Sequence, residues 1–166
     1  MDNLEDYLGD WILKLALPND FNQGPRCPFA KSVWDSSRAK IVKCPNYDIF
    51  QFWETVSTEC EQFDTTYDIA IIATDTIFNP FQLDNVIDAL NIYLNTQNKD
   101  LWLLQSCNDH YSMVFIQRIT EIDDASKILE TLPYYNKMHP YEFIKSIEHR
   151  RKLRDNLQGN LVDKTT

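Results

Sequence analysis

The sequence predicts an α/β fold: a single domain with a mixed sheet of about four strands and helices on both faces. Segment 67–74 (YDIAIIAT) is a continuous apolar run of strand length, which is typical of a strand buried on both faces. From residue 40 the predicted elements follow the order strand, helix, strand, helix, strand, strand, helix, so helical crossovers join parallel strands. A length of 166 residues and an apolar fraction of 43% support one self-sufficient core.

Residues before this strand are expected to form helices around one short strand. Apolar residues at three- to four-residue spacing predict a first helix over 4–17, which Pro18 ends. Proline is well tolerated at the first helical position, so Cys27-Pro28 predicts the start of a short helix to about Trp34. The next expected elements are a strand over 40–44 and a helix over 48–63.

The second half of the chain begins with a helix whose start is marked by Asn79-Pro80. Asp123 or Asp124 is the expected N-cap of a later helix, and His139-Pro140 marks the start of the last one. The expected elements are a helix over 79–95, an antiparallel hairpin of strands 101–105 and 113–119, and helices over 123–132 and 139–157. A single domain over 1–157 and a polar flexible tail over 158–166 follow from this pattern.

Composition excludes several classes of protein. With 3 glycines and no Walker or dinucleotide fingerprint, the chain offers no phosphate-binding loop. No apolar run approaches the roughly 20 residues of a membrane span, and the acidic segment 1–10 does not resemble a signal peptide. The 4 cysteines form no Cys-x-x-Cys pair, so reduced thiols and a cytoplasmic location are expected.

Charge is arranged in blocks along the chain, whose net charge is −9. Residues 44–100 contain ten acidic residues and a single basic one, Lys99. Two basic blocks, 25–43 and 137–154, flank this acidic middle and have a local charge of +4 each. They either form one anion-attracting surface or neutralise the acidic middle. Direct nucleic-acid binding is not expected, because the net charge repels phosphate.

The segment RCPFAK (26–31) holds the strongest candidate for a reactive group. Cys27 falls at the predicted N-cap, where unpaired N–H groups and the helix dipole favour a thiolate. Arg26 and Lys31 flank it with positive charge, and a thiolate there would be a nucleophile or redox thiol. The alternative is a small buried residue that anchors the loop, since cysteine is among the most buried residue types.

The last predicted helix supplies candidate partners for this thiol. His139 is the candidate acid or base, because histidine titrates near neutral pH. Arg150 and Arg151, together with Arg26 and Lys31, are candidates for holding an anionic substrate, since a guanidinium fork binds carboxylate or phosphate. The alternative is an exposed basic face that complements the helix dipole.

The other cysteines are expected to be structural, and neither a cofactor nor a metal is expected. Cys60 continues the apolar face of its predicted helix, and Cys44 ends a strand at a helix start. Cys107 and His110 have a spacing that suits zinc, but no second ligand pair stands at a recognisable spacing. A hairpin turn is therefore expected there.

The Cys27-Pro28-Phe29-Ala30 segment resembles the motif of a family of small bacterial proteins of unknown function. The resemblance covers most of the chain, and residues 136–151 are similar to a later block of that family; Arg26 departs from the apolar residue usual before the cysteine. It implies a fold and a location for the site. The element order is also similar to the thioredoxin-like fold, with Cys44-Pro45 at the place of the reactive cysteine and Tyr47 in place of a second one.

Two functional hypotheses follow, and the sequence does not decide whether the protein is an enzyme. The first is a cytoplasmic protein with a thiol-containing site, around Cys27, for an anionic small molecule. The second is a non-enzymatic adaptor that docks a protein partner through its acidic face 44–100 or its aromatic turns at 134–135 and 140–141. An acidic decoy that mimics DNA is a minor form of the second. No membrane interaction is expected, and the oligomeric state is left open.

Overall fold

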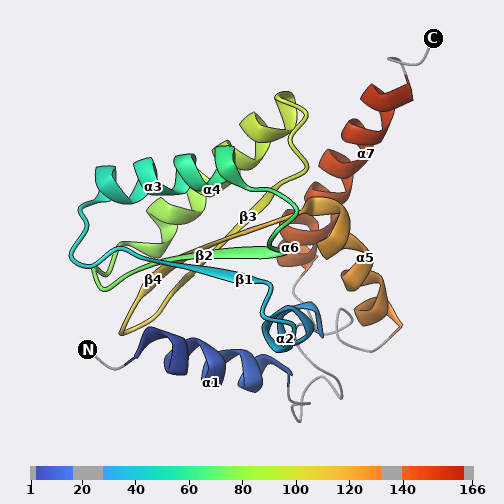
Figure 1. Ribbon diagram of the computed structural model, residues 1–166. Coiled ribbons are helices and arrows are strands. Elements are labelled where there is room, and N and C mark those ends of the chain that lie inside the picture. Colours follow the sequence, from blue (N-terminus) through green and yellow to red (C-terminus); the bar gives the residue numbers. More distant parts are fainter. Residues whose placement is uncertain (1–2, 17–27, 132–139, 163–166) are drawn as a thin grey trace. The chain divides into compact units, whose positions relative to one another are not determined.

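The chain forms an α/β structure around one four-stranded mixed sheet (Figure 1). This computed structural model describes residues 3–16, 28–131 and 140–162. Strands β1 (Ala39–Lys43) and β2 (Ile69–Thr74) pair in parallel, and β4 (Ser112–Gln117) lies antiparallel between β2 and β3 (Trp102–Cys107). The predicted fold class, the mixed sheet and the order of its elements are confirmed.

Two compact units make up the chain. A sheet unit contains residues 39–118 and 156–166, and a helical unit contains residues 1–38 and 119–155. Among the described helices, none combines the length and the apolar character that crossing a membrane requires.

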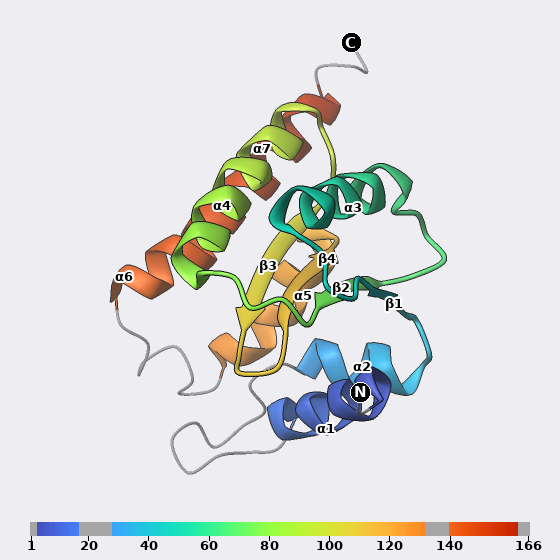
Figure 2. The ribbon, with the colours of Figure 1, turned by 90° about the vertical axis from the view of Figure 1, so that its left-hand side faces the viewer.

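The core of the sheet unit lies beneath two helices, α3 (Ile49–Gln62) and α4 (Pro80–Thr96), which cover the same face of the sheet (Figure 2). The core includes Phe52, Val56 and Leu83 from these helices, which pack in one cluster with Ile72 and Val114 of the strands. All six residues of β2 are buried, so its two faces are both covered. This burial explains the uninterrupted apolar run that marked the strand in the sequence.

Side-chain caps fix where α3 and α4 begin. Asp48 and Gln51 form a capping box, in which the Asp48 carboxylate accepts from the Gln51 N–H at 2.9 Å and the Gln51 side chain accepts from the Asp48 N–H at 3.0 Å. The Asn79 side chain accepts from the Phe81 N–H at 3.0 Å, with Pro80 at the first helical position. Both helices therefore start where the sequence predicts.

A buried asparagine of α4 holds one edge of the sheet. The Asn91 amide accepts from the Leu103 N–H at 2.8 Å and donates to the Leu103 carbonyl at 3.0 Å. Asn91 and Leu103 are 1% and 0% exposed, so the side chain takes the place of a neighbouring strand for the backbone of β3. These two hydrogen bonds attach α4 to β3.

The helical unit contains α1 (Leu4–Ala16), α2 (Pro28–Asp35), α5 (Ile119–Glu130) and the first half of α7 (His149–Val162). Before α7 come the short helix α6 (Pro140–Phe143) and a π-helical turn over Ile144–Glu148. Helices α1 and α2 pack closely, and a Cβ added at Gly9 would lie 3.4 Å from the ring of Trp34. The Trp34 indole therefore lies against the α1 backbone at Gly9, with room for a methyl group at contact distance.

Helix α5 differs from its prediction at its start. It begins at Ile119, so Asp123 and Asp124 lie inside the helix and the predicted N-cap is wrong. Ile119 and Ile122 are 1% and 8% exposed, and their burial stabilises the helix from residue 119 onward. The last helix also departs from prediction, because α7 continues beyond Leu157 to Val162.

Candidate interaction surface at the carboxyl ends of the parallel strands

Three residues of the predicted thiol site, Arg26, Cys27 and His139, lie outside the described residues. Helix α2 begins at Pro28, as the sequence predicts. Lys31 lies on α2, where it is exposed and pairs with Asp35 one turn later. The thiol site therefore stays a prediction.

Arg150 and Arg151 bind carboxylates of the helical unit. The Asp123 carboxylate is fully buried, with Arg150 at 3.5 Å and Arg151 at 3.4 Å, and Arg154 also binds it. Arg151 binds Glu130 as well. These arginines therefore attach α7 to α5 through an ion cluster, and its carboxylates, Asp123 and Glu130, lie outside the acidic middle 44–100 that the sequence suggested for this basic block. Their role as anion ligands stays a prediction.

The three described cysteines are free thiols. Burial raises the pKa of the Cys44 thiol, and it raises the pKa of Cys60 to about 12, with Glu59 acting in the same direction in both cases. The pKa of Cys107 is raised mainly by burial. All three therefore remain protonated at neutral pH, which favours the structural role expected for them.

The predicted turn between the last two strands is confirmed. Cys107 and Ser112 are the final pair of the β3–β4 hairpin, and the Asn108 side chain accepts from the N–H groups of His110 and Tyr111 at 2.9 Å each. Within the described ranges, no three His, Cys, Asp or Glu side chains lie close enough together to hold a metal ion.

The most distinctive surface of the sheet unit is formed by residues 45–50 and 75–81, which follow β1 and β2; we call it the strand-end surface. The Asn46 N–H donates to the Asp75 carboxylate at 2.6 Å, and this bond joins the two segments. Asn46 has a φ of 56°, a conformation that asparagine tolerates well. The Phe78 N–H donates to the Ser112 hydroxyl at 2.9 Å, so the second segment is also attached to β4.

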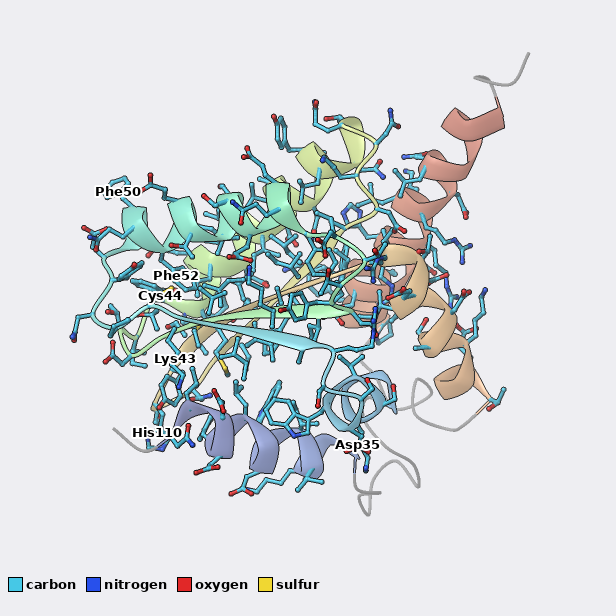
Figure 3. The ribbon with its side chains drawn as sticks, viewed as in Figure 1. Asp35, Lys43, Cys44, Phe50, Phe52 and His110 are labelled. Carbon is cyan, nitrogen blue, oxygen red and sulfur yellow. The ribbon has the colours of Figure 1, made fainter. Side chains whose placement is uncertain are left out.

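Large apolar side chains project from this surface into solvent. Phe50 is 83% exposed in the first turn of α3, whereas Phe52, two residues later, is fully buried (Figure 3). Phe81 is 79% exposed in the first turn of α4, and Ile77 is half-exposed before it. Because α3 and α4 each return from one of two parallel strands, both helices begin at the same end of the sheet.

An apolar groove lies between α3 and α4, nearer their carboxyl ends. It has a volume of about 420 Å³, and its apolar lining comes from Cys60, Leu90, Tyr93 and Leu94. Tyr93 is more than half exposed, and Val86, one helical turn before Leu90, is partly exposed. Apolar side chains therefore lie on α3 and α4 near both the amino and the carboxyl ends of these helices.

The stretch of chain that carries these apolar groups is rich in acidic residues, and the exposed Lys43 ends β1 two residues before it. Residues 45–98 contain nine acidic residues and no Lys, Arg or His. Two of the acids are paired with bases from elsewhere in the sheet unit, Glu59 with Lys40 at 2.6 Å and Asp68 with Arg118 at 3.4 Å. The acidic face was predicted from the sequence, but the exposed aromatic rings were missed. Their exposure could have been predicted from their positions in the helices, because neither Phe50 nor Phe81 falls on the apolar face of its helix.

Comparisons with protein-family models, with curated proteins and with solved structures found no match to this chain. The candidate function therefore depends on what its own side chains present, and the strand-end surface presents exposed aromatic rings in an acidic setting.

Proposed function

We propose that the protein is an interaction module that binds a partner protein through the strand-end surface. The observation that carries this proposal is the exposure of Phe50 and Phe81, 83% and 79%, in the first turns of adjacent helices. Isolated exposed apolar residues are ordinary, whereas several at one end of a sheet indicate a binding surface.

The two rings offer substantial binding energy. An aromatic side chain buries about 150–250 Å², so covering both would remove roughly 300 Å² of apolar surface from water. At about 25 cal/mol per Å² this contributes on the order of 7 kcal/mol before the costs of association.

The hydrogen bonds that hold the strand-end surface lower those costs. Asn46 is bonded to Asp75, and Asp48 and Asn79 cap the helices that carry the two rings. A surface whose backbone is fixed before binding loses less conformational entropy when a partner docks. Aromatic side chains on such supports are typical of the few residues that dominate an interface.

Charge indicates the chemistry of the partner. The surface belongs to a stretch of 54 residues, 45–98, that contains no basic side chain, so a partner segment with apolar and basic residues complements it. Exposed aromatic rings favour such a segment over the DNA-mimic alternative, which needs only carboxylates. The thiol site at Cys27 and the cytoplasmic location stay predictions beside this proposal.

Affinity capture from the native cell extract at moderate salt tests the proposal. We expect one stoichiometric partner to be retained by the native protein and lost from the double variant Phe50→Ala/Phe81→Ala. Leu13→Ala, which truncates an exposed side chain on α1, is the matched control and should retain it. Equal retention by all three proteins, or no specific partner at all, would contradict the proposal.

A further inference from the structure

A polar cleft lies along α3 beside the strand-end surface; we call it the α3 cleft. Its volume is about 340 Å³, and it is lined by Tyr47, Gln51, Glu54, Thr55, Thr58 and Glu59. We propose that this cleft binds the guanidinium group of an arginine side chain. The inference rests on the proposed function, because the arginine would belong to the partner that docks on the strand-end surface.

The hydroxyl groups of the cleft are oriented as hydrogen-bond acceptors. Thr55 donates its hydroxyl proton to the Gln51 carbonyl at 3.0 Å, and Thr58 donates to the Glu54 carbonyl at 2.9 Å. The Thr55 hydroxyl also shares a hydrogen bond with the Cys44 thiol. With their protons committed to the α3 backbone, the Thr58 oxygen and the remaining lone pair of Thr55 can only accept from a ligand. The lining therefore favours a ligand that donates hydrogen bonds.

The cleft already contacts one cation of the protein. Glu59 is buried and binds the Lys40 ammonium at 2.6 Å. Glu54, five residues earlier on α3, is exposed and forms no ion pair with any described residue. Lys40 neutralises Glu59, so Glu54 provides charge for one further monovalent cation.

A guanidinium fits this lining better than an ammonium does. It carries five N–H donors in a plane, which can reach a carboxylate and neighbouring hydroxyl oxygens together. Its flat face also stacks on aromatic rings, and the Tyr47 ring lies at the cleft. Tyr47 belongs to the strand-end surface as well, so one partner segment can cover Phe50 and place an arginine in the cleft.

Nuclear magnetic resonance of the isotope-labelled protein tests this binding without a partner. The probe is N-acetyl-arginine methylamide, and its uncharged analogue N-acetyl-citrulline methylamide is the control. We expect saturable shifts of the Gln51, Thr55 and Thr58 amide signals with the arginine probe alone. Glu54→Gln should weaken this binding about fivefold, the size of one charge-assisted contact near a surface. Glu61→Gln removes an exposed acid of the same helix outside the cleft and should leave it unchanged.

Three results would overturn the inference: equal shifts with the citrulline probe, non-saturating shifts spread over all acidic segments, or equal weakening by Glu54→Gln and Glu61→Gln. None of them bears on the partner capture that tests the proposed function. Conversely, saturable arginine binding together with capture that ignores Phe50 and Phe81 would overturn the proposed function and leave the cleft as an arginine site.

Discussion

Replacing Asn91 with alanine should destabilise the sheet unit more than any exposed substitution on the same helix. The Asn91 side chain makes both hydrogen bonds to the backbone of Leu103, at 2.8 Å and 3.0 Å, in a buried environment. Alanine would leave the Leu103 N–H and carbonyl without these partners and out of reach of bulk water.

The expected loss follows from these two contacts. Leaving a buried donor or acceptor unsatisfied costs about 1–3 kcal/mol, so two such groups, with some relaxation, give a loss of about 3 kcal/mol. Asn91→Asp should also destabilise, because it keeps the acceptor for the Leu103 N–H but directs a carboxylate oxygen at the Leu103 carbonyl. Asn85→Ala, at an exposed position of α4, is the control and should change stability by less than about 0.5 kcal/mol.

Urea unfolding followed by circular dichroism measures the free energy of unfolding, and amide hydrogen exchange reports on Leu103 itself. We expect a lower unfolding midpoint for Asn91→Ala and faster exchange at Leu103 than in the native protein. A stability equal to that of Asn85→Ala, with the Leu103 amide still protected, would refute the role assigned to Asn91.

Three further predictions concern other parts of the molecule. Asp123→Asn should lower the free energy of unfolding by about 3 kcal/mol in urea titrations, because it leaves three arginines without their shared buried carboxylate, whereas the exposed neighbour Asp124→Asn should change little. Gly9→Ala should raise the thermal midpoint and increase the free energy of unfolding by up to about 1 kcal/mol, because alanine favours the helix and its methyl group would lie at contact distance from the facing indole. A lower midpoint would contradict this packing. The Cys60 pKa is raised to about 12, so stability should fall as the pH rises from about 9 to 12, where only the unfolded chain releases this proton, and Cys60→Ala should make that fall shallower.

The elements of the fold were predictable because their signals are local. Helix starts at Pro28 and Pro80 and the apolar run of β2 follow from short stretches of sequence. The sheet order β1-β2-β4-β3 depends on pairing between distant segments, which local periodicity does not specify. Asp123 shows the same limit, since its N-cap pattern was outweighed by burial against the arginines of α7, 27 to 31 residues later.

The candidate surface was predictable in its charge and not in its shape. The acidic stretch is visible in the sequence, but the pairing that brings the starts of α3 and α4 to one end of the sheet is not. Only the strand pairing shows that Phe50 and Phe81 lie at the same end of the sheet. The α3 cleft also requires the structure, because its lining combines Tyr47 with residues from three successive turns of one helix face.

Photo-crosslinking from position 50 tests the central claim most directly. The crosslinker p-benzoylphenylalanine would replace Phe50, an aromatic ring that is 83% exposed, and the control would carry it in place of Leu13 on α1. We predict a light-dependent adduct from position 50 with the same partner that affinity capture retains, and none from position 13. No adduct from position 50, or equal adducts from both positions, would contradict the assignment of the strand-end surface as the binding site.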